Sequence, residues 1–136
     1  MTTGRDIAAG TGASDSSAHT VRLEFGRDPD APRRARRFIG QLVEGPLGDD
    51  ARLVTSELVT NVIQHTSSAG VIRAIDHRPD GPLRIEISDD DPAVPVSIGA
   101  QEVGGRGLTI VRHLSARWGV RSIEGDGKVV WAEFGP

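Results

Sequence analysis

The most regular pattern in the chain lies between residues 49 and 65. Val54, Leu58 and Val62 recur every four residues, which places them in one row along a helix. Three further apolar residues widen this row: Leu53, Val59 and Ile63. An apolar face this broad has to be covered by another layer of secondary structure, so the helix is expected to pack on a sheet.

Shorter patterns on either side complete the element order. Alternation and apolar spacing predict a strand at 21–25, a helix at 31–43, a hairpin with strands at 71–76 and 83–88, a helix at 107–117 and a last hairpin with strands at 119–123 and 128–134. The long connection at 89–106 is of a length that is usually functional. This order predicts an α+β two-layer sandwich, in which three helices cover one face of a mixed, mostly antiparallel sheet.

Length and composition predict one domain. Of the 136 residues, 1–19 are rich in Gly, Ser and Thr with Ile7 as the single large aliphatic residue, which predicts a disordered tail before a domain at 20–136. The absence of cysteine excludes disulfides and thiolate metal sites. No apolar run approaches the roughly 20 residues of a membrane span, and no signal peptide is recognisable, so we expect a cytoplasmic protein without a membrane partner. A net charge of −3 argues against direct nucleic-acid binding.

The first group of candidate site residues lies on the helix at 49–65. Glu57 and Asn61 are four residues apart, so they point the same way beside the apolar row. An Asn oxygen can bind Mg²⁺, which prefers oxygen ligands, and a Glu can deprotonate a hydroxyl. The alternative is a polar helix edge without a chemical role.

The second candidate is Asp89, directly at the end of a cleanly alternating strand. An ionised carboxylate only accepts hydrogen bonds, so it suits an exocyclic amine such as that of adenine. The alternative is that Asp89 opens a turn, a position in which Asp is common.

The third candidate is the glycine-rich run 104–107, which leads into the helix at 107–117. Glycines allow the backbone to approach an anion, and a helix N-terminus offers unpaired N–H groups. Arg106 adds a cation suited to phosphate. The run is neither a Rossmann fingerprint nor a P-loop, and a flexible loop before a helix is the alternative explanation.

The order of these three groups resembles the histidine-kinase-like (GHKL or Bergerat) ATPase fold. Its N box corresponds to Glu57–Asn61, its first glycine box begins at Asp89, and its second glycine box corresponds to 105–108. Four runs, "LVTSELVTNVIQHT", "LRIEISDDDPAVP", "GGRGLTIVRHLSARWGV" and "GDGKVVWAEF", are more narrowly similar to the anti-sigma-factor kinases and the small ATP-binding regulators common in actinobacteria. This likeness covers roughly residues 21–135.

The resemblance implies a role for each candidate. Glu57 would be the catalytic base, Asn61 would hold Mg²⁺, and Asp89 would recognise the adenine amine of ATP. The second glycine box would bind the phosphates through four residues: Gly105, Arg106, Gly107 and Leu108.

The resemblance also implies the reaction and the partners. Such a protein would be a serine/threonine kinase that transfers the γ-phosphate of ATP to a STAS-fold anti-anti-sigma factor, and many relatives also bind a sigma factor and form homodimers. The alternative function is a non-catalytic switch that sequesters a sigma factor or another regulator under nucleotide control. A basic face on the first helix would then dock a partner or simply be solvated: Arg33, Arg34, Arg36 and Arg37.

The sequence departs from the family pattern at two places. Asp91 and Ala93 replace the two glycines of the first glycine box, so the turn after Asp89 must differ and the affinity for nucleotide is expected to be lower. Val129 stands where a Thr near the adenine is common. Trp118 and Trp131, which flank the last hairpin, are expected in the core.

Overall fold

The computed structural model describes residues 18–65, 69–91, 106–123 and 127–136. The elements are β1 (His19–Phe25), α2 (Ala31–Leu42), α3 (Gly45–His65), β2 (Gly70–Asp76), β3 (Leu83–Asp89), α5 (Arg106–Leu114), β4 (Arg117–Ile123) and β5 (Gly127–Phe134). Their order along the chain confirms the predicted one. Most of the predicted N-terminal tail lies outside the described residues, and His19 already belongs to β1.

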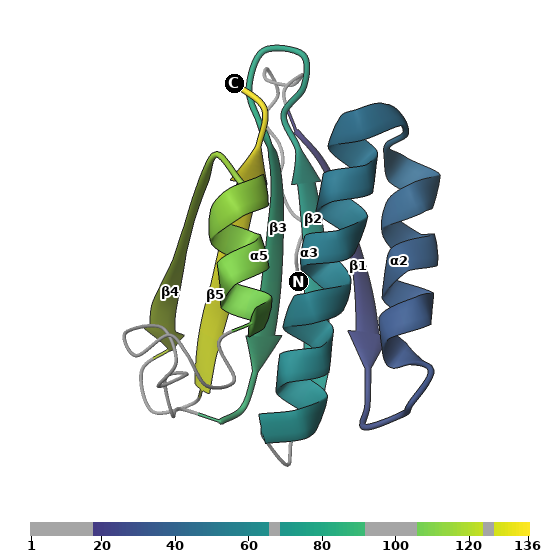
Figure 1. Ribbon diagram of the computed structural model, residues 1–136, viewed down its shortest axis with the longest axis vertical. Helices are drawn as coiled ribbons and strands as arrows, with labels where there is room; N and C mark the ends of the chain where they lie inside the picture. The colour runs from purple at the N-terminus through teal and green to yellow at the C-terminus, as the bar shows by residue number, and fades with distance from the viewer. Residues whose placement is uncertain (1–17, 66–68, 92–105, 124–126) are drawn as a thin grey trace.

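The sheet has the order β1-β2-β3-β5-β4, and each neighbouring pair of strands is antiparallel. The three helices lie on one face of it, which confirms the predicted two layers (Figure 1). The expectation of a mixed sheet was wrong for a topological reason. Strands β3 and β4 run in the same direction, but β5 lies between them and pairs with both in the opposite direction.

The core between the two layers is aliphatic. Alternate residues of β2 and β3 face the helices, and Ile72, Ile85 and Ile87 are at most 1% exposed. From α3, the predicted row of Val54, Leu58 and Val62 is buried against them. None of the helices in the described residues is long and apolar enough to cross a membrane.

Two details of α3 differ from the sequence-based expectation. Leu53 was predicted to widen the apolar row, but it is 41% exposed because it lies on the solvent side of the helix. The helix also begins at Gly45 rather than near residue 49. Gly45 has a φ of 82°, and a Cβ at Gly48 would lie 2.6 Å from the Val43 carbonyl oxygen, so glycine at these positions permits a sharp turn between α2 and α3.

The third helix is also shorter than predicted, since α5 ends at Leu114 and β4 already begins at Arg117. Trp118 packs against the core as expected, but Trp131 does not belong to the core cluster. Trp131 lies opposite Glu86 and Gly119 on the face of the sheet away from the helices. There the Arg84 guanidinium lies 4.3 Å from the centre of its ring, a cation–π contact.

The open face of the sheet carries an ionic network centred on Glu133. Arg84 donates to one carboxylate oxygen at 2.8 Å, and Arg117 donates to the other at 2.9 Å. Burial on its own would raise the pKa of Glu133, but these hydrogen bonds and the two positive charges outweigh it and hold the pKa below its ordinary value of 4.5. Glu133 therefore stabilises the folded state in its ionised form.

This network predicts a specific loss of stability in acid. A carboxylate with a lowered pKa in the folded state contributes stability above its unfolded pKa, and this is lost as the pH falls from about 4.5 through the folded value. We expect urea denaturation curves of the Glu133→Gln variant to depend less on pH below 4.5 than those of the parent. Glu24→Gln, which alters an exposed pair with Arg22, is the control and should keep the parental pH dependence.

Candidate functional site

The three sequence motifs meet at one end of the molecule. The C-terminal end of α3, the last residue of β3 and the first turn of α5 all lie at the lower end in Figure 1. This follows from the connections, since α3 and β3 both finish at this end and α5 starts there and packs against α3. The structure thus brings together elements that are separated by more than forty residues in the chain.

Glu57 and Asn61 are half-buried on α3, next to the buried residues Leu58 and Val62. Neither makes a hydrogen bond or an ion pair with another residue that the structure describes. Other polar side chains of α3 behave differently. Thr55 and Thr60 donate to backbone carbonyl oxygens four residues earlier, at 2.7 and 2.8 Å. The polar atoms of Glu57 and Asn61 therefore remain available for a ligand.

Asp89 is the last residue of β3 and only 4% exposed. One carboxylate oxygen, Oδ1, accepts from the backbone N–H of Asp91 at 2.8 Å and from Nζ of Lys128 at 3.0 Å. The other, Oδ2, is also 3.0 Å from Nζ, an ion-pair distance. It is buried, however, and makes no hydrogen bond of normal geometry among the described residues. A buried carboxylate oxygen with an unused lone pair is an acceptor for a ligand donor.

Lys128 is the site residue that sequence reasoning missed. It lies directly opposite Asp89 in the pairing of β3 with β5 and is 4% exposed. Its ammonium also donates to the Asp91 carbonyl oxygen at 3.1 Å. One signal was available, because Lys128 is the only lysine in a chain with sixteen basic residues. Its partner could not be found without the register of the last hairpin.

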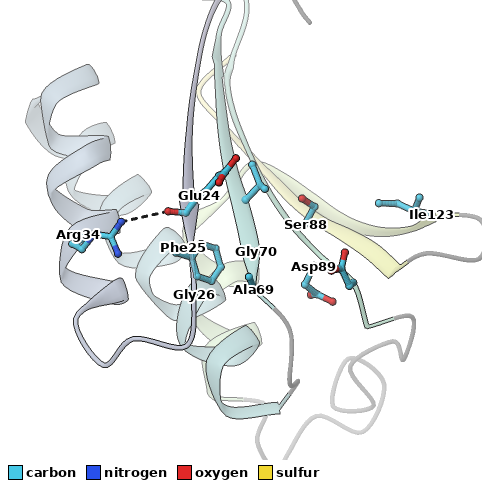
Figure 2. Close-up of a pocket in the computed structure, with 11 residues that line it drawn as sticks. Glu24, Phe25, Gly26, Arg34, Ala69, Gly70, Ser88, Asp89 and Ile123 are labelled. Atoms are coloured by element: carbon cyan, nitrogen blue, oxygen red, sulfur yellow. Dashed lines mark hydrogen bonds between the residues drawn. The ribbon is translucent and has the colours of Figure 1, made fainter. Parts of the chain in front are cut away.

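A hollow of about 580 Å³ opens beside Asp89 at the ends of β1, β2 and β3. Figure 2 shows Phe25, Gly70 and Ser88 around it, with Arg34 of α2 at one side. A Cβ at Gly70 would come within 2.4 Å of the Phe25 ring, so glycine allows these strands to close on each other. Glu57 and Asn61 do not line this hollow, and it therefore reaches only the Asp89 part of the predicted site.

The glycine boxes are only partly described. Gly105 and Ala93 lie outside the described residues. Arg106, Gly107 and Leu108 form the first turn of α5, so the helix begins one residue earlier than predicted, and their backbone alone is described. The first N–H groups of a helix have no partner within it and suit an anion.

The comparisons with known proteins agree with this arrangement. A family model for the histidine kinase-like ATPase domain matches residues 25–134. The chain belongs to this family. No curated protein is significantly similar to this histidine kinase-like ATPase domain.

Among solved structures, the domain is similar to a crystal structure of the RsbU and RsbW domains of Rv1364c from Mycobacterium tuberculosis, with a TM-score of 0.64 and 15% sequence identity. The match covers 85% of the present chain but only 32% of that longer chain. At this identity, the likeness supports the fold.

The residues present fit a bound nucleotide in part. A histidine kinase-like ATPase domain implies nucleotide binding, and Asp89 Oδ2 is a buried acceptor of the kind that the amine of adenine requires. No three Asp, Glu or His side chains among the described residues form a metal-binding group. Asn61 fits Mg²⁺ only together with phosphate oxygens, which is how this ion is commonly held. Among the described residues, the ammonium of Lys128 beside Asp89 does not fit an adenine amine at this carboxylate.

Because Asp89 is part of a buried ion pair, a mutation of Asp89 should also change the stability of the fold. Removing one partner of a buried ion pair leaves an uncompensated charge, which typically costs about 3–5 kcal/mol. We expect Asp89→Asn to lower the free energy of unfolding in urea by this amount, and Asp89→Asn with Lys128→Met to recover most of it. Asp30→Asn, in an exposed pair with Arg33, should cost less than about 1 kcal/mol. An Asp89→Asn protein as stable as the parent would contradict the buried pair.

Proposed function

We propose that this domain binds Mg-ATP and acts as a serine/threonine kinase of the anti-sigma-factor type. The proposal rests on one observation: the C-terminal half of α3, which carries Glu57 and Asn61, the end of β3 at Asp89 and the first turn of α5 lie toward the same end of the sheet (Figure 1). The resemblance to anti-sigma-factor kinases and the structural likeness to a protein with an RsbW domain support the narrower assignment.

Each residue has a distinct part in the proposed reaction. Asp89 accepts a hydrogen bond from the amine of adenine, and the N–H groups of Arg106, Gly107 and Leu108, with Gly105 before them, bind the phosphates. Asn61 holds Mg²⁺ against the phosphates. When bound, Mg-ATP supplies the γ-phosphoryl group and neutralises charge that develops during transfer. Glu57 would accept the proton of the Ser or Thr hydroxyl as its oxygen attacks the γ-phosphorus, the bond from the γ-phosphorus to the β-phosphate oxygen breaks, and ADP leaves.

The proposed substrate is a STAS-fold anti-anti-sigma factor, and a sigma factor is the proposed second partner. Helix α2 supports a protein interface of this kind because two of the four arginines on its basic face form no ion pair with a described residue. Arg33 and Arg34 pair with Asp30 and Asp28, at 3.1 and 3.7 Å. The remaining two arginines of this face, Arg36 and Arg37, are exposed and form no ion pair with a described residue. Arginines in this state suit carboxylates of a partner, and a homodimer is also part of the proposal.

A second function is favoured by a specific observation. Asp91 replaces the first glycine after Asp89, and its backbone N–H and carbonyl oxygen are both tied to the Asp89–Lys128 pair. If this arrangement prevents a productive nucleotide complex, the protein would act as a non-catalytic switch that sequesters a sigma factor or another regulator.

Binding of Mg-ATP should depend on Asn61. We expect isothermal titration calorimetry to show binding in Mg²⁺ that weakens at least about tenfold in EDTA or in the Asn61→Ala variant, because either change would remove the ion or the oxygen ligand that would hold it. Gln64→Ala, an exposed change one turn away on α3, should bind like the parent. Equal affinity with and without Mg²⁺ would contradict the metal site.

Phosphoryl transfer should depend on Glu57. Gln keeps the size of the side chain but removes its basic oxygen, and removal of a general base commonly costs about 10²–10⁴ in rate. We expect Glu57→Gln to keep ATP and partner binding within a few-fold while losing transfer of ³²P from γ-labelled ATP to a STAS-fold protein. Glu44→Gln, an exposed glutamate between α2 and α3, is the matched control.

The same assay separates the two functions. A parent protein that binds its STAS-fold partner and ATP but transfers no phosphate supports the switch. Transfer at the parental rate by Glu57→Gln would support a kinase that uses another base.

A further inference from the structure

The carboxylate of Asp89 is the most enclosed acceptor in the proposed nucleotide site, and its side chain is only 1% exposed. The backbone N–H of Asp91 donates to its Oδ1, and the ammonium of Lys128 is 3.0 Å from both of its oxygens. A ligand donor that approaches Oδ2 from the side of Nζ therefore meets a cation that is already at ion-pair distance from this oxygen.

The position of Lys128 is held by the backbone around it. Lys128 is directly opposite Asp89 in the sheet, and its side chain is 5% exposed. The preceding residue, Gly127, has a φ of 124°, and a Cβ there would lie 2.0 Å from the Asp89 carbonyl oxygen. Only glycine allows β5 to start this close to the end of β3. The sheet thus fixes the backbones of Lys128 and Asp89 opposite each other, and the contact of their charges depends on the lysine side chain.

The type of cation is also specific. Fifteen of the sixteen basic residues of the chain are arginines, and the single lysine stands at this position. An arginine would hold a carboxylate with two parallel hydrogen bonds from a rigid fork, whereas lysine offers a compact ammonium on a flexible stem. A lysine can therefore leave a carboxylate by rotation of its own side chain.

We propose that Lys128 occupies the position on Asp89 that the exocyclic amine of adenine takes in the nucleotide complex, so that ATP binds only when Lys128 leaves this carboxylate. The inference rests on the proposed nucleotide site. Lys128 is then a residue that sets nucleotide affinity, because the apparent dissociation constant is the intrinsic one divided by the fraction of molecules in which Asp89 is open. The pairing of β3 with β5, which places Lys128 opposite Asp89, thereby lowers the affinity of the domain for ATP.

The first test removes the competing ammonium. We expect Lys128→Met to be less stable than the parent without ligand, because Asp89 then lacks its cation, but to bind ATP and ADP at least about tenfold more tightly by calorimetry. Arg84→Met is the matched control, since it removes a cation of the same sheet from the Glu86 and Glu133 carboxylates on the open face. This control should bind ATP like the parent.

The second test uses the unmodified protein and does not depend on the stability of a variant. Because Lys128 is the only lysine, labelling with ¹³Cε-lysine gives a single lysine signal in a carbon–proton NMR spectrum. We expect this signal to move toward the position of a solvent-exposed lysine as Mg-ATP is added. Inorganic tripolyphosphate, which has no base, should leave it unchanged.

The outcomes distinguish this inference from the proposed function. If the parent, Lys128→Met and Arg84→Met all fail to bind Mg-ATP, the nucleotide site itself is wrong and the inference falls with it. If the parent binds Mg-ATP but Lys128→Met binds equally or more weakly, Lys128 positions Asp89 for the base rather than competing with it, and the inference alone is overturned. A lysine signal that ATP does not move, or that tripolyphosphate moves equally, also overturns it.

Discussion

The burial of α3 against three neighbours is the constraint on which the rest of the structure depends. The helix packs against the sheet, α2 and α5, and its buried apolar residues form part of the core between the two layers. Among the polar residues of this helix, Thr55 and Thr60 donate to backbone carbonyl oxygens of the helix itself. Glu57 and Asn61 are half-buried and unpaired within the described residues. Packing thereby leaves the polar atoms of these two side chains without a described partner, as the proposed function requires.

The strand order of the antiparallel sheet determines which residues lie next to the end of β3. Because β5 is inserted between β3 and β4, the first residues of the last hairpin strand lie beside the last residues of β3. This register places the cation of Lys128 on the carboxylate of Asp89, both of them away from water. A buried ion pair gains less from its Coulomb attraction than its short distances suggest, since both charges lose their hydration. Such a pair is a poor source of stability and suits a position where one partner is exchanged for a ligand.

This member of the histidine kinase-like ATPase family combines residues that follow the family pattern with residues that depart from it. The polar pair of α3 and the first turn of α5 agree with the family pattern, and the departures lie at Val129 of β5 and after Asp89. There Asp91 replaces a glycine, donates its N–H to Asp89 and accepts from Lys128. The altered first glycine box and the lysine therefore form one connected structure. Its effect on the nucleotide is the property that separates a kinase from a switch.

Local patterns in the sequence determined the element order, the two layers and the residues of the α3 edge, because spacings of two and of three to four residues report directly which side of a strand or helix is apolar. They could not assign Leu53 or Trp131, since both follow an apolar pattern but lie on surfaces that no other layer covers. They also could not reveal the pairing of Lys128 with Asp89. These residues are 39 positions apart, and only the strand order and register bring their charges together. Contacts of this kind depend on how whole elements pack, a physical property that no single segment of the sequence contains.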